Sequence, residues 1–98
     1  MAEISWTLEA ERWLKDIYNY IAIDNPSAAG RVVEGIHDKA QILRKFPEIG
    51  HKYPFDRKRE IRIFLYGHYR IAYLVKPDKN IDILGVFHGA LDIDKYLF

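Results

Sequence analysis

The chain of 98 residues contains no cysteine, which excludes a disulfide scaffold and any metal site with thiolate ligands. No apolar run approaches the length that spans a membrane. The segment 1–13 carries three glutamates and lacks the apolar stretch of a secretory signal. Internal repeats and low-complexity tracts are also absent. These absences favour a cytoplasmic protein with no membrane segment.

The residues that are present are typical of one ordered globular domain. They are 49% hydrophobic and 30% charged, a balance that excludes intrinsic disorder. A chain of this length has room for one core, so we expect a single domain over residues 1–98. Tyr, Phe and Trp make up 14% of the residues and supply much of the area that such a small core can bury.

Positive charge is concentrated in one segment, although the net charge of the chain is only +1. Between residues 51 and 62 the acidic residues are Asp56 and Glu60. The Lys and Arg residues in the same segment are Lys52, Arg57, Lys58, Arg59 and Arg62. Such a segment is either a solvated loop or a binding site for an anionic partner. The candidate anion-binding residues are Arg57, Lys58, Arg59, Arg62 and, from a later segment, Arg70.

Two amphipathic helices are predicted in the first half of the chain. Apolar residues recur at three- and four-residue spacing from residue 10 to residue 21, after a cap at Thr7, and again from residue 29 to residue 43. Pro26 suits the first turn of a helix that Asn25 caps, so the second helix begins there. A link this short predicts an antiparallel helical hairpin.

Short apolar or alternating segments predict strands on both sides of the helical hairpin. The predicted strands are 3–7, 60–65, 68–75 and 80–88. The resulting order is β-αα-βββ. We therefore predict an α+β fold in which the helical hairpin packs on one face of an antiparallel sheet.

The stretch FLYGHYRIAYLV raises the question of which face of the sheet Arg70 occupies. A two-residue turn at Gly67-His68 would pair Leu65 with Arg70 and place the guanidinium among apolar side chains. A three-residue loop that ends at Gly67 pairs Arg62 with Arg70 instead and separates apolar from polar side chains. Burial of an unpaired arginine is strongly unfavourable. We therefore predict the second register, with Arg70 beside Arg62 on the face away from the helices.

In the last strand the predicted core face is Ile81, Ile83 and Phe87. Leu84, Val86 and His88 then lie on the same face as Arg70, although an even turn before the strand would reverse the two faces. Gly85 in mid-strand predicts a bulge or a close approach of backbone. His88 is either a functional group on that face or a strand-end residue hydrogen-bonded to a neighbour.

Motifs for most enzymatic chemistries are missing. No phosphate loop, dinucleotide fingerprint, zinc spacing or nucleophile elbow occurs, and Ser5 and Ser27 are typical of cap or turn positions. We therefore predict no metal and no cofactor. What remains is a basic sheet face with tyrosines, which can hold a phosphodiester. A metal-free ribonuclease needs little more than such cations and one acid or base.

Four segments resemble the RelE/ParE family of bacterial toxins from type II toxin–antitoxin modules. They are LKDIYNYIAIDNPSAA, LRKFPEIG, REIRIFLYGHYRIAYLV and IDILGVFHGALDI, in this order. The resemblance covers essentially the whole chain and implies the same β-αα-βββ order. It also implies a small toxin, of a kind associated with plasmid stabilisation, that a cognate ParD- or RelB-like antitoxin neutralises in a hetero-oligomer.

For the ribonuclease branch of the family, the resemblance implies the catalytic residues Arg70, His88, Arg62 and Tyr96. Arg70 and Arg62 would hold the scissile phosphate, and His88 would act as general acid or base. Two departures count against catalysis, because many relatives carry an arginine at the positions of Gly85 and Leu91. The DNP link and the long helical hairpin also look more like the ParE branch, whose members poison DNA gyrase.

The first functional hypothesis is therefore a ParE-like toxin that arrests growth by poisoning DNA gyrase and cleaves no bond. The alternative is a RelE-like mRNA interferase, an endonuclease that acts on ribosome-bound mRNA. A third is a degenerate toxin that only binds its antitoxin. In each case we expect the antitoxin to lay an amphipathic segment in an apolar groove beside the helical hairpin, with acidic residues near Arg57 to Arg62.

Overall fold

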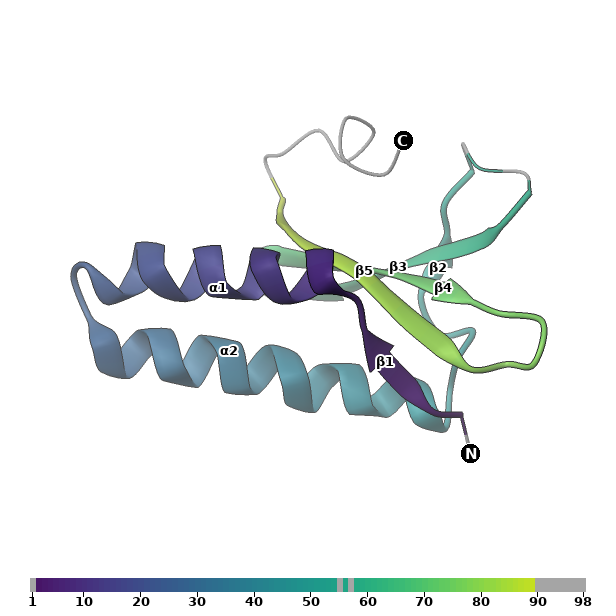
Figure 1. The fold of residues 1–98 in the computed structure, drawn as a ribbon, viewed down its shortest axis with the longest axis horizontal. Helices are drawn as coiled ribbons and strands as arrows, with labels where there is room; N and C mark the ends of the chain where they lie inside the picture. Colours follow the sequence, from purple (N-terminus) through teal and green to yellow (C-terminus); the bar gives the residue numbers. More distant parts are fainter. Residues whose placement is uncertain (1, 55, 57, 90–98) are drawn as a thin grey trace.

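The structure, a computed structural model, describes residues 2–54, 56 and 58–89 and has the α+β fold that the sequence predicts (Figure 1). The elements are β1 (Ile4–Trp6), α1 (Leu8–Ala22), α2 (Pro26–Gln41), the 3-10 turn η1 (Ile42–Arg44), β2 (His51–Lys52), β3 (Glu60–Tyr66), β4 (Tyr69–Val75) and β5 (Ile81–His88). The short β2 and η1 are additions to the predicted order. The other bounds agree closely with those predicted from the sequence.

The predicted caps fix where both helices begin. The Thr7 Oγ1 accepts a hydrogen bond from the Ala10 N–H at 3.1 Å and donates one to the Ile83 carbonyl at 2.7 Å. The Asn25 Oδ1 accepts from the Ala28 N–H at 3.1 Å. The bonds from the Ala10 and Ala28 N–H groups satisfy donors that the first turn of a helix leaves unpaired. Thr7 therefore caps α1 and also ties its first turn to β5.

The helical hairpin covers one face of the sheet, as predicted (Figure 1). The main core lies between the two layers, and both layers contribute its side chains. Its fully buried members are Ala10, Ile36, Ala40, Leu43, Ile71, Tyr73, Ile81, Ile83 and Val86. The contributing helix residues recur about one turn apart, so each helix presents a single apolar stripe to the sheet.

The sheet is mixed, because its first strand runs parallel to its last. The strand order is β1-β5-β4-β3-β2. The pairs β3–β4 and β4–β5 are antiparallel, as predicted, and the additional strand β2 pairs with β3 in the same sense. In contrast, β1 pairs with β5 in parallel, through Ile4 and Ile81. Segments from the two ends of the described chain therefore lie side by side at one edge of the sheet (Figure 1).

The hairpin between β3 and β4 has the two-residue turn, so the predicted three-residue loop is wrong. Leu65 pairs with Arg70. Gly67 and His68 form the turn, and Gly67 has a φ of 56°, which glycine adopts without strain. A glycine at the first central position is typical of the type II′ turn, whose twist matches that of the strands. Arg62 is consequently not the cross-strand neighbour of Arg70.

The predicted register is wrong because the sheet is apolar on both faces. That register turns Ile61 and Ile63 toward the helices, but they lie on the opposite face, in a second buried cluster. The second cluster consists of Tyr53, Ile61, Ile63, Ala72 and Phe87. Arg70 shares this face, since it pairs with Leu65 and Phe87. Its predicted side, away from the helices, is confirmed, although its cross-strand neighbours are apolar.

A bulge in β5 changes the face of the second half of this strand. Leu84 is the extra residue, because Ile83 and Gly85 pair with adjacent residues of β4. Val86 consequently lies in the core beneath the helices and Phe87 shares the face of Arg70, the reverse of the prediction, although the Phe87 ring also meets the Trp13 ring of α1 edge-on at 4.7 Å. The predicted bulge is confirmed, whereas the close neighbours of Gly85 are the side chains of Phe87 and Trp13 and not backbone. A Cβ there would lie 2.5 Å from the Phe87 Cζ, so this position has room for glycine alone.

Candidate functional site

A groove of about 550 Å³ lies between α1 and the adjoining ends of β4 and β5. Its lining residues are Trp13, Asp16, Ile17, Tyr20, Ile21, Tyr69, Val86 and His88, and we refer to it as the α1 groove. Apolar and aromatic side chains make up most of the lining, and Asp16 adds a carboxylate. The predicted groove beside the helical hairpin is therefore present.

Tyr20 is a member of the α1 groove that the sequence analysis did not single out. Its side chain is 79% exposed, so it does not belong to the apolar stripe that packs on the sheet. Its spacing from Ile17 and Trp13 could have identified it, because residues three and seven apart lie on one side of a helix.

His88 ends β5 and borders the α1 groove. It pairs with Tyr69, so it faces the helices and not the side of Arg70. Its ring stacks on that of His68 with 6.3 Å between centroids and meets the Tyr69 ring edge-on at 5.9 Å. The predicted shared face of His88 and Arg70 is therefore wrong. The structure places His88 in an aromatic cluster at one end of the sheet.

Arg70 lies at the same end of the sheet, on the other face. Its Nη2 donates a long hydrogen bond, 3.4 Å, to the Gly89 carbonyl. The Gly89 N–H donates in turn to the His68 carbonyl at 2.7 Å. The Arg70 side chain is half-buried beside the second cluster. Gly89 therefore links Arg70 to the end of the sheet where the two histidines stack.

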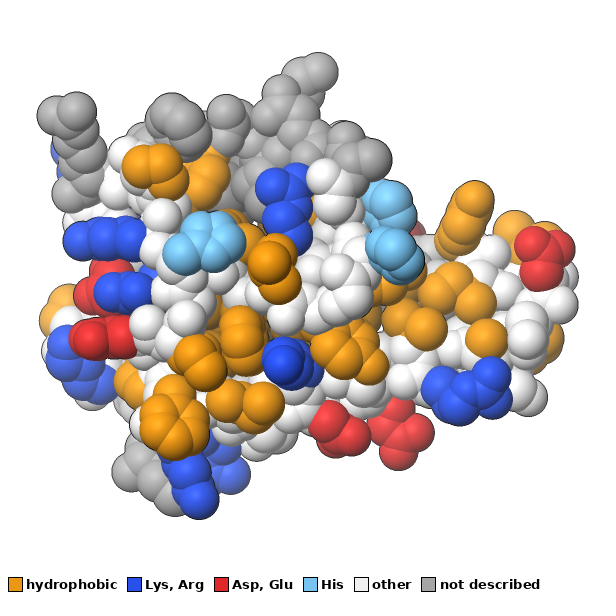
Figure 2. All heavy atoms as spheres, turned by 180° about the vertical axis from the view of Figure 1, so that it is seen from behind, with side chains coloured by type: hydrophobic (Ala, Val, Ile, Leu, Met, Phe, Trp, Pro, Cys, Tyr) orange, Lys and Arg blue, Asp and Glu red, His pale blue; other side chains and the backbone are white. Residues whose placement is uncertain are grey.

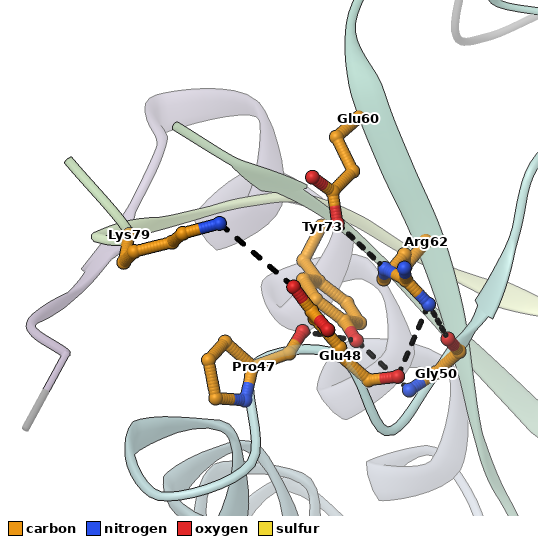
Figure 3. Close-up of polar contacts among 7 residues, drawn as sticks. All are labelled: Pro47, Glu48, Gly50, Glu60, Arg62, Tyr73 and Lys79. Atoms are coloured by element: carbon orange, nitrogen blue, oxygen red, sulfur yellow. Dashed lines mark hydrogen bonds and ion pairs between the residues drawn. The ribbon is translucent and has the colours of Figure 1, made fainter. Parts of the chain in front are cut away.

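Arg62 lies far from that end and holds the loop that follows η1 (Figure 3). Its Nε donates to Glu60 Oε2 at 2.9 Å. Its Nη1 donates to the Glu48 carbonyl at 3.0 Å and to the Gly50 carbonyl at 2.8 Å. Only 18% of the Arg62 side chain is exposed. The guanidinium is therefore engaged with acceptors of the protein itself.

Tyr73 fixes the same loop through its hydroxyl (Figure 3). Its hydroxyl accepts the Gly50 N–H at 2.9 Å and donates to the Pro47 carbonyl at 2.9 Å. Burial raises the pKa of Tyr73 above its usual 10.0, which keeps the hydroxyl protonated and able to donate. Tyr73 lies in the predicted strand 68–75, but no contact of its hydroxyl was predicted. A tyrosine in place of phenylalanine on an apolar strand face was the available signal, because a buried hydroxyl needs a partner.

The basic segment before β3 is organised by Asp56. Its Oδ1 accepts the N–H groups of Lys58 at 3.0 Å and Arg59 at 2.9 Å, and its Oδ2 accepts the Arg59 Nε at 2.7 Å. These bonds, above all the one from the Arg59 backbone, hold the pKa of Asp56 below its usual 3.8. Lys58 and Arg59 are exposed, so an anionic partner can reach them. Arg57 lies outside the described residues.

The sheet does not bring the predicted catalytic residues to one point. His88 and Arg70 lie at the same end of the sheet, on opposite faces. Arg62 pairs with residue 73 of β4 and His88 with residue 69, which places them about 13 Å apart along the strand. Tyr96 lies outside the described residues. The three described residues of the predicted set therefore do not share one surface.

Neither a cluster that could bind a metal nor a helix that could span a membrane occurs within residues 2–54, 56 and 58–89. In these ranges no three or more His, Cys, Asp or Glu residues come together in a way that could hold a metal ion. None of the helices described there combines the length and the apolar character that crossing a bilayer requires.

Comparison with known proteins agrees with the fold. The chain matches the sequence model of the family described as "ParE toxin of type II toxin-antitoxin system, parDE" over residues 4–93. A protein of Sinorhizobium fredii (strain NBRC 101917 / NGR234) named "Putative toxin Y4kP" is 36% identical over 86 residues, which are 88% of this chain and 86% of that protein. A solved structure, "Chromosomal ParDE TA system from P. aeruginosa", has the same fold, with a TM-score of 0.74 and 24% identity over 90% of this chain and 96% of the other. Because the family match spans every helix and strand described above, the chain belongs to the ParE toxin family of type II toxin–antitoxin systems.

Proposed function

We propose that this toxin arrests growth by poisoning DNA gyrase and that it cleaves no bond itself. Membership of the ParE family supports a toxin. The observation that carries the choice between poisoning and cleavage is the separation of Arg62 from Arg70 and His88. Cleavage of a phosphodiester needs its cations and its acid or base around one phosphate. A half-buried Arg62 that already donates to two carbonyls and a carboxylate is poorly placed for that role.

We further propose that a cognate antitoxin neutralises the toxin in a hetero-oligomer by laying an amphipathic segment in the α1 groove. The largely apolar lining of the groove suits the apolar face of such a segment. Acidic residues farther along the antitoxin would meet Lys58 and Arg59 of the basic segment. Because exposed charges are screened by salt, affinity for the antitoxin should fall as ionic strength rises.

Purified toxin and purified DNA gyrase test the main proposal. We expect the toxin to inhibit supercoiling and to increase the amount of gyrase trapped in covalent complexes with DNA. Toxin mixed beforehand with its antitoxin is the control and should have no effect. Induction in cells should give filaments and a DNA-damage response. Growth arrest by a toxin that leaves purified gyrase unaffected would contradict the proposal.

Cleavage of ribosome-bound mRNA is the second candidate, and the contacts of Gly89 favour it. Gly89 links the Arg70 guanidinium to the turn that carries His68, whose ring stacks on that of His88. One cation and two imidazoles therefore lie at one end of the sheet. Primer extension on translated messages after induction should then show cuts within codons, and intact messages during full growth arrest would exclude this candidate. Gyrase and ribosomes are both cytoplasmic, so either candidate implies the predicted location.

A further inference from the structure

The loop that follows η1 carries large apolar side chains on its outside. We refer to residues 45–50 as the α2–β2 loop. In this loop Phe46 is 58% exposed and Ile49 is 51% exposed. They line a hollow of about 480 Å³, named here the apolar hollow, together with Pro47, Glu48 and Lys79. Neither the α1 groove nor the basic segment includes these residues.

The α2–β2 loop is held rigidly from inside the molecule (Figure 3). The buried Tyr73 hydroxyl bonds to the backbone at Pro47 and Gly50, and Arg62 bonds to the carbonyls of Glu48 and Gly50. The backbone of the loop is therefore anchored to the core, while the side chains of Phe46 and Ile49 are exposed on its outer side. A surface that is rigid before binding loses less entropy when a partner docks.

Lys79 stands at the rim of the apolar hollow in a conformation that lysine rarely adopts. Its φ is 71°, in the left-handed region that glycine or asparagine occupies more easily. Its N–H donates to the Lys76 carbonyl at 2.8 Å, and its Nζ lies 3.8 Å from Glu48 Oε1. A glycine would serve the turn equally well but would remove the ammonium group from the rim. The lysine at this position therefore supports a role for its ammonium group in binding a partner, in addition to its place in the turn.

The surroundings of the apolar hollow are positively charged. Besides Lys79 in its lining, the exposed cations Arg44 and Lys45 directly precede Phe46 in the chain, and Glu48 of the lining already lies near Lys79. Figure 2 shows charged side chains of both signs next to hydrophobic ones toward the sheet end of the molecule. Charge complementarity therefore calls for an acidic partner. Of the apolar side chains in its lining only Phe46 has a ring that could stack on a base, whereas Ile49 and Pro47 cannot, which favours a protein over DNA or RNA.

The apolar hollow and the α1 groove lie at opposite ends of the helical hairpin. The groove follows the C-terminal half of α1, next to the turn between the helices. The hollow follows the C-terminal end of α2 (Figure 1). Because the helices are antiparallel, the length of α2, about 24 Å, separates the two ends. A partner in the groove leaves the hollow open to a second protein.

We propose that the apolar hollow is a second protein-binding surface, which receives an apolar side chain flanked by acidic residues of the protein that the toxin attacks. The identity of that protein as DNA gyrase rests on the proposed function, whereas the surface and the chemistry of its partner do not. The antitoxin has its own surface in the α1 groove, so binding of the antitoxin and binding at the hollow are separable by mutation.

The double variant Phe46→Ser/Ile49→Ser tests the proposal, with Leu8→Ser as the matched control. Leu8 is 63% exposed and lines neither the groove nor the hollow, so its replacement removes exposed apolar area elsewhere on the molecule. We expect the double variant to remain folded, to bind the antitoxin with unchanged affinity and to bind gyrase about tenfold or more weakly, with loss of growth arrest. The control should arrest growth like the unaltered chain. Full growth arrest by a folded double variant would overturn the proposal.

Lys79→Glu supplies a second test that leaves the apolar surface in place. We expect growth arrest and gyrase binding to weaken, and the remaining binding to depend less on salt. Weakened antitoxin binding in both variants would assign the hollow to the antitoxin and overturn the proposal. Two further results would also overturn it: loss of binding to a short DNA duplex with gyrase binding intact, or a dimer that the double variant converts to a monomer in sedimentation.

The identity of the target as gyrase and the role of the apolar hollow as its binding surface can be disproved separately. If the unaltered toxin arrests growth without affecting gyrase, the proposed function is wrong. The growth assay still tests the hollow in that case, because it depends on no assumption about the target. Loss of arrest with intact antitoxin binding then supports the hollow, and retained arrest excludes it.

Discussion

Arg62 and Arg70 are half-buried arginines on neighbouring strands, and they differ in what surrounds them. Arg62 donates to Glu60 and to two loop carbonyls at 2.8 to 3.0 Å. Arg70 lies on the opposite face, pairs with apolar residues and donates to Gly89 at 3.4 Å. The short bonds of Arg62 to Glu60 and to two loop carbonyls are typical of a structural role. The comparison teaches that a basic residue in a strand acquires its role from the register of that strand.

The largest expected loss of stability follows from replacing Arg62. Arg62→Ala should lower the free energy of unfolding by about 2–3 kcal/mol, because it leaves the half-buried Glu60 carboxylate and two loop carbonyls without their donor. Urea unfolding followed by circular dichroism measures the change. Arg12→Ala removes an exposed pair with Glu9 and is the control, with an expected change within about 0.5 kcal/mol. Equal losses in the two variants would contradict a structural role for Arg62.

Tyr73 supports the same loop and should have an intermediate effect. Tyr73→Phe should destabilise the fold by about 1–2 kcal/mol, because the Gly50 N–H and the Pro47 carbonyl lose their partner. Burial raises the pKa of Tyr73 in the folded state, so the unfolded chain ionises first as pH rises. This contribution to stability is therefore complete below pH 10.0 and declines as pH rises above it. Unfolding measured from about pH 8 to about pH 11 should show a smaller decline in Tyr73→Phe than in Tyr20→Phe, and identical pH profiles would refute this account.

The smallest expected change in stability belongs to Arg70. Arg70→Ala should change the free energy of unfolding by no more than about 1 kcal/mol, since no fully buried side chain is removed. If the toxin poisons gyrase, the variant should mainly bind the antitoxin more weakly, as titration calorimetry would measure. If the toxin cuts mRNA, the variant should lose toxicity. An unfolded variant would make Arg70 structural like Arg62, and a variant that folds, binds antitoxin and arrests growth unchanged would leave it without a functional role.

Features that depend on neighbouring residues could be predicted from the sequence. Thr7 and Asn25 cap the two helices as expected, because a cap needs only a side-chain oxygen and the N–H groups of the next turn. The bulge at Gly85 follows equally from one residue in mid-strand. The apolar stripe of α1 was enough to predict a groove beside the hairpin.

Features that depend on distant residues could not be predicted. Alternation assigns side chains to two faces but does not say that both faces are buried, so Ile61 and Ile63 were turned to the wrong side. The predicted shared face of His88 and Arg70 is wrong for a different reason, because the bulge at Leu84 turns the second half of β5 over. The apolar hollow depends on a Tyr73 hydroxyl that reaches Pro47 from 26 residues away, which no local pattern reveals.

The parallel pairing of β1 with β5 determines when this protein can finish folding during translation. The Glu3 N–H donates to Asn80 Oδ1 at 3.0 Å across 77 residues of sequence, and the Thr7 hydroxyl donates to the Ile83 carbonyl across 76. A growing chain makes β1 and both helices first, while the strand that must accept β1 is still to be synthesised. Contacts so distant in sequence also close slowly, because the loop between them loses entropy on closure. The sheet is therefore complete only after the β5 segment has left the ribosome, and the cell that makes this toxin is not exposed to its finished surface until then.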